Sequence, residues 1–372
     1  MKVLITSLAY LPFVGGAELA VKEITDRIAD CEFDLITVNL DGRQRAFERI
    51  GRINVYRLGR GKFGKYLFPF SGYKKACELQ AQNHYDAVWA IMANQAGILA
   101  WRLKRKFPAV KYLLTLQEGD SWWQIWVRTF LIRPIYKQIY RRADFIQPIS
   151  QFLARRAKAL GYRGKLAVIP NGVDLVNFTK EFEAEDLSAF KKELGIAPDD
   201  KVVATISRLV RKNGIDTLIK AAKDLPIKIL IIGCGKLETK LKALAQEIGV
   251  KDKILFIGYV NQRDLPRYLK ISDVFVRTSR SEGLGTAFLE AMAAGVPVIG
   301  TPVGGITDFL RDEETGLLAE VGNPRDLARQ IQKYLAQPAL YEKIKANGVK
   351  MVMDKYDWRP IAEKVRQIFN EI

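Results

Sequence analysis

Short apolar runs alternate with helix-like segments along the whole of this 372-residue chain. In the first half, the runs that predict strands cover residues 2–7, 33–40, 53–58, 86–91, 110–115, 145–149 and 166–169. Segments with helical spacing lie between most of them, at 17–29, 72–83, 95–106, 122–142 and 151–160. Because consecutive parallel strands need a long crossover connection, usually a helix, this order predicts a mainly parallel sheet with helices on both faces.

The same scheme starts again in the second half, with strands predicted near 201–206, 227–232, 254–257, 273–277, 297–300 and 316–319. Strand 166–169 ends in the turn residues Pro170-Asn171-Gly172-Val173-Asp174, and an acidic stretch without periodicity follows. We therefore predict a hinge near 171–198 between two α/β domains, which fits the length. Since open parallel sheets bind ligands beyond the carboxyl ends of their strands, two facing sheets are expected to form an interdomain cleft.

Composition removes several classes of protein. The chain is 48% hydrophobic and contains no run of 18 apolar residues, and its start lacks a signal-peptide layout, so neither a membrane span nor export is indicated. The cysteines Cys31, Cys77 and Cys234 are few and far apart, which predicts buried, reduced cytoplasmic thiols. A single histidine, His84, removes most zinc sites and most Ser-His or Cys-His nucleophiles.

The excess of positive charge is concentrated in one stretch. The net charge is +18, and residues 51–165 contain 22 Lys and Arg against 5 Asp and Glu. Such clustering creates a local field that attracts nucleic acid, anionic lipid or a phosphorylated substrate. The alternative is a basic, solvated surface that serves solubility alone.

The segment 278–298 is the most informative for chemistry. It follows a predicted strand, contains Gly283 and Gly285, and runs into an Ala-rich helix. Glycines let backbone amides approach a ligand closely, and amides at a helix N-terminus favour anions, so this loop is predicted to hold phosphate. Glu282 and Glu290 are eight positions apart, up to about 12 Å along a helix axis, and would grip the hydroxyls at two ends of an elongated ligand. The alternative is that Glu282 merely caps the helix and that Glu290 is an exposed helix residue.

Two further loops follow predicted strands. Arg208, Arg211 and Lys212 come after strand 201–206, where cations could clamp a diphosphate and stabilise the charge that grows as it leaves. Gly15 and Gly16 open a helix after strand 2–7, which is either another anion-binding backbone or a tight turn.

Taken in order, Gly15-Gly16-Ala17-Glu18, the segment 170–174, Ser207-Arg208-Leu209 and the Glu282-to-Glu290 motif resemble family 4 of the retaining GT-B glycosyltransferases. The resemblance covers essentially the whole chain. It implies an α/β GT-B fold with two Rossmann-like domains. These would be an acceptor domain, 1–170 plus 356–372, and a nucleotide-sugar donor domain, 171–355.

The resemblance also assigns roles. Glu282 would contact the transferred sugar, Glu290 the ribose and Arg208 the diphosphate, while Gly16 would reach the phosphates from the opposite domain. Glu282, Arg208 and Lys212 are the candidate catalytic residues. The candidate donor-binding residues are Gly15, Gly16, Arg211, Asn213, Val260, Gly283, Leu284, Gly285, Thr286 and Glu290.

Two positions depart from the family pattern. Asn213 stands where the family usually has a lysine, so Lys212 or Arg211 would supply the charge, or the donor is held differently. Strand 110–115 leads into Gln117-Glu118-Gly119-Asp120, where the family commonly has a histidine. Gln117 can hydrogen-bond a sugar hydroxyl but cannot shuttle a proton, and we place Gln117, Glu118 and Asp120 on the acceptor side.

The stretch 121–142 mixes Trp and Tyr with Arg and Lys, and 62–70 has a similar composition. Both are typical of interfacial elements that bind an anionic membrane surface. A core helix with a basic outer face is the alternative.

The resemblance implies that no metal is required, and together with these observations it predicts a hexosyltransferase without a cofactor, which moves a sugar from a nucleotide-diphosphate donor to a hydroxyl of a lipid-linked or other glycan acceptor. It would be cytoplasmic and peripheral at the inner face of the membrane, with no nucleic-acid partner. The alternatives are a nucleotide-sugar epimerase or glycogen-synthase-like enzyme of the same fold, or a basic nucleic-acid-binding protein.

Overall fold

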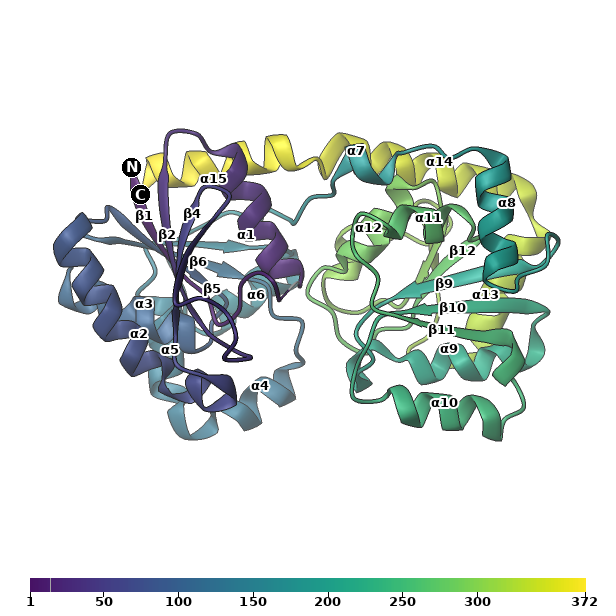
Figure 1. Ribbon diagram of the computed structural model, residues 1–372, viewed down its shortest axis with the longest axis horizontal. Coiled ribbons are helices and arrows are strands. Elements are labelled where there is room, and N and C mark those ends of the chain that lie inside the picture. The colour runs from purple at the N-terminus through teal and green to yellow at the C-terminus, as the bar shows by residue number, and fades with distance from the viewer. Residues whose placement is uncertain (14) are drawn as a thin grey trace. The chain divides into compact units, whose positions relative to one another are not determined.

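The computed structural model describes residues 1–13 and 15–372 (Figure 1). These residues form two compact units. Unit 1 comprises Met1–Gly172 together with Trp358–Ile372, and unit 2 comprises Val173–Asp357. The chain therefore passes between the units twice, at Gly172–Val173 and at Asp357–Trp358.

Unit 1 is built on an eight-stranded sheet in which only the edge strand β3 runs antiparallel. Its buried strands are continuous apolar runs, as expected for a parallel sheet that is covered on both faces. The order across the sheet is β3 (Phe47–Ile50), β4 (Ile53–Leu58), β2 (Glu32–Val38), β1 (Lys2–Thr6), β5 (Ala87–Ile91), β6 (Lys111–Leu116), β7 (Phe145–Pro148) and β8 (Lys165–Leu166).

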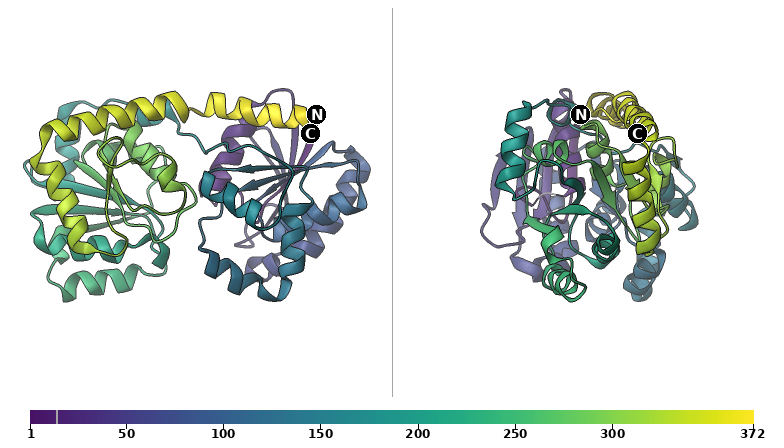
Figure 2. Two further views of the ribbon diagram at one scale, coloured as in Figure 1. Left: turned by 180° about the vertical axis from the view of Figure 1, so that it is seen from behind. Right: turned by 90° about the vertical axis from the view of Figure 1, so that its right-hand side faces the viewer.

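Helices cover both faces of this sheet. On one face, α1 (Gly16–Arg27) packs beside α15 (Trp358–Glu371), and Figure 2 shows α15 along the top of the unit. Five side chains of α15, including Trp358 and Phe369, enter the core of that face. The other helices of the unit are α2 (Gly61–Asn83), α3 (Gln95–Lys106), α4 (Trp122–Thr129), the 3-10 turn η1 (Phe130–Ile132), α5 (Arg133–Arg141) and α6 (Gln151–Ala159).

Unit 2 has a six-stranded sheet in which every pair is parallel. The order is β11 (Ile254–Gly258), β10 (Ile227–Ile232), β9 (Lys201–Ile206), β12 (Val274–Arg277), β13 (Val298–Gly300) and β14 (Leu317–Leu318). One face packs on α9 (Ile215–Ala221), α10 (Glu238–Glu247) and α13 (Pro324–Ala336). The remaining helices are α7 (Leu175–Phe178), α8 (Ala184–Glu193), α11 (Leu265–Lys270), α12 (Thr286–Ala293) and α14 (Pro338–Lys355).

The strand order locates the edge at which each sheet is expected to bind ligands. In unit 2 the chain builds β9, β10 and β11 in one direction and then returns to place β12 on the other side of β9. In unit 1 the same reversal lies between the neighbouring strands β1 and β5, because the chain builds β2 and β4 on one side of β1 and places β5 on the other. Ligands bind beyond the carboxyl ends of strands at such reversals, so the loops after β9 and β12 in unit 2, and after β1 and β5 in unit 1, are the places to examine.

The predicted α/β class with two parallel sheets is confirmed, while some elements differ from expectation. β3 was not predicted, because its four residues alternate between exposed and partly buried positions at a sheet edge. The segment 122–142 is two helices and a 3-10 turn, since Pro134 starts a new helix. The predicted hinge 171–198 contains α7 and α8.

The cysteines also differ from the prediction. Cys31 is buried, Cys77 is partly buried and Cys234 is exposed, so the expectation of buried thiols is wrong for Cys234. The reason is local: Cys234 lies between Gly233 and Gly235 in the loop after β10 rather than inside the sheet.

Candidate functional site

The loops that follow β9 and β12 in unit 2 are joined by their backbones. Gly214 has a φ of +66°, and a Cβ at this position would lie 1.9 Å from the carbonyl oxygen of Thr278. The Thr278 hydroxyl donates to the Gly214 carbonyl oxygen at 2.7 Å, and the Arg280 N–H donates to the Lys212 carbonyl oxygen at 2.6 Å. Only glycine combines this conformation with this approach, so the sequence fixes the two loops against each other.

A bidentate ion pair also connects the loops after β9 and β12. The guanidinium of Arg280 donates to both carboxylate oxygens of Asp216, at 2.9 and 2.7 Å, and also to the Arg211 carbonyl oxygen at 2.8 Å. Asp216 lies in the first turn of α9, where a carboxylate also favours the helix dipole. Arg280, in the loop after β12, therefore has a structural role. The cations of the loop after β9 are Arg208, Arg211 and Lys212.

The basic loop presents its charges unevenly. Arg208 and Arg211 are exposed and Lys212 is partly buried. Asn213 is buried, and its side-chain amide donates to the Arg208 carbonyl oxygen at 2.7 Å. The amide thus shapes the loop from inside, where a lysine ammonium would have to be buried. Whether Asn213 contacts a donor stays a prediction.

Glu282 is held by its neighbours at the carboxyl end of β12. Its carboxylate pairs with the Arg277 guanidinium at 2.6 Å, and both side chains are only 12% exposed. It also accepts from the Gly283 N–H at 3.1 Å and from the Ser279 hydroxyl at 3.4 Å. The backbone is fixed too, because a Cβ on Gly304 would lie 1.9 Å from the Glu282 carbonyl oxygen.

Glu290 is buried inside unit 2. It lies on α12, is 7% exposed, and accepts a hydrogen bond from the Gln262 side chain at 2.9 Å. Burial raises the pKa of Glu290 from 4.5 to about 7, and the charge of Arg277 opposes this rise. Burying a carboxylate is energetically costly, which argues against a purely incidental role for Glu290.

The predicted glycine-rich turn lies between these two carboxylates. Gly285 has a φ of +95° and forms the N-cap of α12, whose first residue is Thr286. Gly283 and Leu284 are buried, and Leu284 is 2% exposed. Val260 is partly buried just beyond the end of β11.

In unit 1, the corresponding edge brings together a second group of predicted residues. The side-chain amide of Asn171 donates to the Gln117 side-chain oxygen at 2.9 Å and contacts the Gly16 carbonyl oxygen at 3.5 Å. Three motifs far apart in the sequence therefore meet beyond β1 and β6. Gly15 is the exposed N-cap of α1 and has extended backbone, with a φ of −138°.

Glu118 and Asp120, by contrast, are engaged with unit 1 itself. The Glu118 carboxylate accepts from the backbone N–H groups of Ala93 and Gln117, and burial raises its pKa. Asp120 pairs with Arg128 at 2.5 Å. Through these contacts both carboxylates stabilise the loop after β6. Their predicted contact with an acceptor stays a prediction.

Two arginines, the buried Arg156 and the partly buried Arg277, were missed by the sequence reasoning. Arg277 pairs with Glu282, and Arg156, 1% exposed on α6, donates to the carbonyl oxygens of Glu118 and Asp120 at 3.3 and 2.6 Å. The signal for Arg277 was available, because a charge at the end of a strand expected to be buried on both faces needs a counter-charge.

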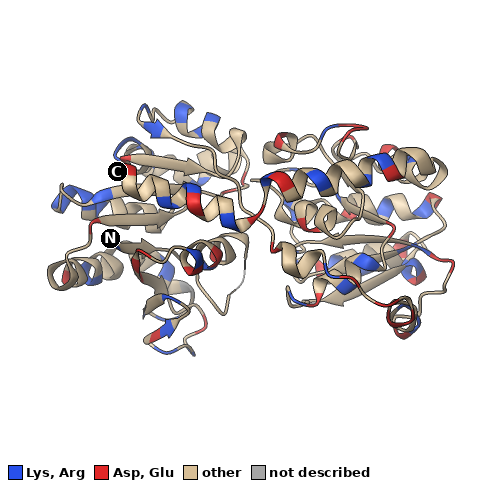
Figure 3. Cartoon of the chain, turned by 90° about the horizontal axis from the view of Figure 1, so that it is seen from above, with Lys and Arg blue, Asp and Glu red and all other residues tan. Residues whose placement is uncertain are grey.

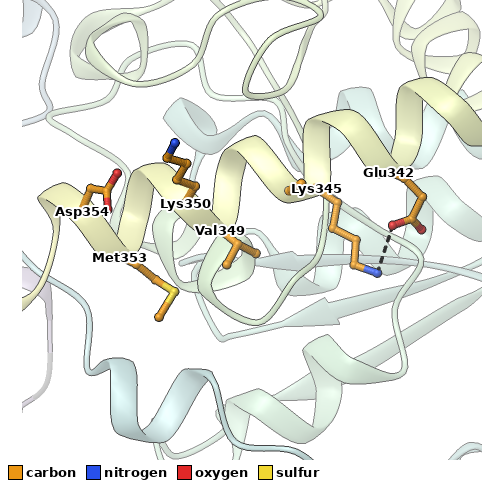
Figure 4. A pocket seen from close by; sticks show the side chains of 7 residues that line it. Glu342, Lys345, Val349, Lys350, Met353 and Asp354 are labelled. Atoms are coloured by element: carbon orange, nitrogen blue, oxygen red, sulfur yellow. Dashed lines mark ion pairs between the residues drawn. The ribbon is translucent and has the colours of Figure 1, made fainter.

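Other features of the described residues do not add to these sites. Among residues 1–13 and 15–372, no group of three or more His, Cys, Asp and Glu side chains could hold a metal ion. A shallow pocket of about 580 Å³ lies along α14, where Val349 and Met353 point to the same side of the helix and Lys345 pairs with Glu342 at 3.6 Å (Figure 4). None of its lining residues belongs to a predicted motif.

Comparisons with known proteins agree with this arrangement. Residues 14–177 match Glycosyltransferase Family 4, and residues 187–351 match Glycosyl transferases group 1. A GDP-mannose-dependent monoacylated alpha-(1-6)-phosphatidylinositol monomannoside mannosyltransferase from Corynebacterium glutamicum is 30% identical over 304 residues, covering 78% of each chain.

Solved structures share the fold over the whole chain. Sucrose-phosphate synthase from Thermosynechococcus elongatus has a TM-score of 0.88 at 23% identity, and the match covers 100% of this chain and 98% of the other. Anabaena HepE, solved with UDP-glucose, has a TM-score of 0.84 at 19% identity and full coverage of both chains. The motifs, the fold and the relatives together show that this chain belongs to glycosyltransferase family 4, the retaining glycosyltransferases of GT-B fold.

Proposed function

We propose that this glycosyltransferase moves a hexose from a nucleotide-diphosphate sugar to a hydroxyl of a lipid-linked or other glycan acceptor, without a metal ion. The observation that carries the proposal is the joined pair of loops after β9 and β12. They put exposed cations, glycine-flanked amides, the partly buried carboxylate of Glu282 and the buried carboxylate of Glu290 on one edge of unit 2. A nucleotide-diphosphate sugar needs all three kinds of group.

Each group has a distinct task in this proposal. Arg208 and Lys212 bind the diphosphate and stabilise its negative charge as the bond to the sugar breaks, with the amides of residues 284–286 assisting. Glu282 accepts hydrogen bonds from hydroxyls of the sugar, and Glu290 accepts from the ribose. Arg211, Asn213 and Val260 are proposed to complete the donor site. The structure of Anabaena HepE in complex with UDP-glucose supports a donor of this class.

Unit 1 is proposed to serve the acceptor. Gln117, fixed by Asn171, would hydrogen-bond an acceptor hydroxyl next to Gly15 and Gly16. The name of the Corynebacterium relative, which specifies a phosphatidylinositol monomannoside, supports an acceptor anchored in lipid.

Exposed apolar stripes on two helices of unit 1 support contact with a membrane surface. On α2, Phe63, Tyr66, Leu67 and Phe70 are 61–82% exposed at helical spacing. From α4 into η1, Trp123, Trp126, Val127 and Phe130 repeat that spacing and are 39–69% exposed. Single exposed apolar residues are ordinary, whereas contiguous stripes mark interaction sites. None of the helices among the described residues is both long and apolar enough to cross a membrane.

Basic residues accompany these stripes. The Arg102 guanidinium lies over the rings of Phe70 and Tyr73, at 5.4 and 4.0 Å from their centroids. Arg128 is 64% exposed on α4. Figure 3 shows Lys and Arg on several helices of unit 1. Basic side chains near an anionic surface contribute about 1 kcal/mol each, so a peripheral enzyme could be recruited by this combination.

A thermal-shift screen with UDP, GDP, ADP and their sugars tests the donor assignment. A ligand at 100 times its Kd should stabilise the folded protein by about 2.7 kcal/mol, so the correct nucleotide raises the Tm. Glu282→Ala should then lose turnover by about a thousandfold while the protein stays folded. Glu314→Ala, an exposed carboxylate in unit 2, is the control and should be as active as the wild type.

Product analysis completes the test. Release of free sugar from the donor in the absence of acceptor would indicate a hydrolase, and conversion to another nucleotide sugar would indicate an epimerase. A fully active Glu282→Ala variant would contradict the proposed site.

A further inference from the structure

Arg277 is a largely enclosed cation, with a side chain 12% exposed, that the proposed function has not used. It ends β12, whose other residues, Val274 to Val276, are fully buried. Its neighbour across the sheet is the buried Gly300 of β13. A guanidinium in such a position is costly unless it is paired, so its partners indicate its role.

Both of its acidic neighbours belong to the proposed donor site. The Arg277 guanidinium contacts the Glu282 carboxylate at 2.6 Å. Its charge also acts on Glu290, where it lowers the pKa that burial raises. One cation at the end of β12 thus serves the two carboxylates that flank the glycine-rich turn.

The pairing of Arg277 is incomplete. Its Nε is buried and has no hydrogen-bond partner, so the guanidinium is not held by a full set of protein acceptors. A purely structural arginine, such as Arg280 on Asp216, is instead bound through two nitrogens to both oxygens of one carboxylate. Arg156, which holds the loop after β6, also has a buried Nε without a partner, so it is the contact with Glu282 that indicates the role of Arg277.

We propose that Arg277 is a positioning residue for the donor sugar: its guanidinium orients the Glu282 carboxylate and offsets the negative charge of Glu282 and Glu290. This inference rests on the proposed function, in which these two carboxylates accept hydrogen bonds from the sugar and the ribose. It adds a residue that acts through Glu282 and does not itself contact the diphosphate.

Electrostatics explains why such a cation is needed. Burial raises the pKa of Glu290 to about 7 while the charge of Arg277 opposes the rise, so removing that charge would favour the protonated form of Glu290 near neutral pH. A protonated Glu290 could donate a hydrogen bond but would lose acceptor strength toward a ribose hydroxyl. A lysine would keep the charge but not the planar fork that orients a carboxylate.

The elements packed against α12 carry other charges, but Arg277 is the one whose charge acts on the pKa of Glu290; most of the others lie on α14, at Glu342, Lys343, Lys345, Lys350, Asp354 and Lys355. Of the elements packed against α12, β12 carries Arg277, whereas α7 and β13 carry no charged residue. From α14, Lys345 lies beside Gly295, beyond the far end of α12. Gln262, the hydrogen-bond partner of Glu290, is neutral.

The test compares Arg277→Leu and Arg277→Lys with the wild type. Binding of the nucleoside diphosphate and of the nucleotide sugar selected by the thermal-shift screen is measured by calorimetry from pH 6 to pH 9. Arg325→Leu, which removes an exposed arginine from α13, is the matched control and should leave both affinities unchanged.

We expect Arg277→Leu to lose about tenfold in affinity for the nucleotide sugar and less for the nucleoside diphosphate, because the two ligands share only the ribose contact through Glu290. The pH at which nucleotide-sugar binding is half-maximal should move upward, because loss of the positive charge favours the protonated form of Glu290. Arg277→Lys should restore this pH while keeping a lower kcat, since charge returns but orientation does not.

Three results would count against the proposal. In Arg277→Leu, either an unchanged affinity and pH profile or an equal loss for diphosphate and nucleotide sugar would overturn it. If circular dichroism shows that Arg277→Leu does not fold, Arg277→Lys decides, and wild-type kcat and KM for the donor in that variant would contradict the orienting role. Failure of the proposed function looks different, because the wild type itself would then bind neither ligand.

Discussion

The two sheet edges where ligands are expected differ in how they are held. At the edge of unit 2, glycines approach carbonyl oxygens so closely that a Cβ would lie 1.9 Å away at Gly214 and at Gly304. At the edge of unit 1, the contacts come from side chains, such as Asn171 on Gln117, and Gly15 faces only the flexible carboxylate of Glu18. In the proposed function unit 2 binds the same donor in every turnover, which a rigid backbone suits. Side-chain contacts can change with the acceptor.

Replacing Gly214 in unit 2 and Gly15 in unit 1 with alanine should give the largest difference in stability between the two edges. Gly214→Ala combines a positive φ with a clash against backbone, and we expect it to lower the free energy of unfolding by about 3 kcal/mol. Gly15→Ala meets only a movable side chain at a φ of −138° and should cost less than about 1 kcal/mol.

Urea unfolding measures both variants, and Gly249→Ala is the control. Gly249 has a φ of +73° with open space around it, so it reports the cost of the backbone conformation alone. Equal losses for Gly214→Ala and Gly249→Ala would show that the clash with Thr278 is not what fixes the loops of unit 2.

The pH dependence of stability should also differ between the two edges. The pKa of Glu290 is about 7 in the folded protein and close to 4.5 in the unfolded chain, so folding favours its protonated form. This stabilising contribution is complete below pH 4.5 and is lost as the pH rises through 7, an effect on the order of 3 kcal/mol. Glu290→Gln should therefore unfold with a flatter pH dependence than the wild type between pH 4.5 and 8.

Glu118 supplies the comparison in unit 1. Burial raises its pKa, but the N–H groups of Ala93 and Gln117 oppose the rise by stabilising the charged form. Glu118→Gln should change the pH dependence less than Glu290→Gln does. A larger change from Glu118→Gln, measured by urea unfolding at the same pH values, would reverse the order proposed for the two edges.

The smallest expected effect concerns the exposed surface of unit 1. Replacing both Trp123 and Trp126 with serine should weaken binding to anionic vesicles about tenfold, because two interfacial rings are lost. Nucleotide-sugar binding should stay at the wild-type level. Val176→Ser is the control, since Val176 is 88% exposed but lies in unit 2. Vesicle flotation at moderate salt makes the measurement, and equal binding by the double variant would remove the membrane proposal.

Sequence reasoning was most successful where the fold repeats a simple pattern. The parallel strands of both units were predicted because buried strands are continuous apolar runs between helices. The antiparallel edge strand β3 was missed, since its four residues carry no such run. The first turns of α2 were assigned as a surface segment, although Pro69 is accommodated inside the helix.

For the candidate sites, sequence placed the residues but not their partners. The glycines and carboxylates of unit 2 were identified by position after a strand and before a helix. No pattern showed that Glu282 pairs with Arg277, or that Asn213 holds the Arg208 carbonyl oxygen. Such pairings depend on side chains brought together by the sheet, over separations that periodicity does not record.

The return of the chain at Trp358 has a consequence for biosynthesis. Unit 2 is one continuous segment, so it can fold as soon as Asp357 has left the ribosome. Unit 1 must wait for α15, because Trp358, Val365 and Phe369 complete the core beside α1. Until then its first 172 residues expose an apolar sheet face, and a nascent chain in that state is a natural client for chaperones.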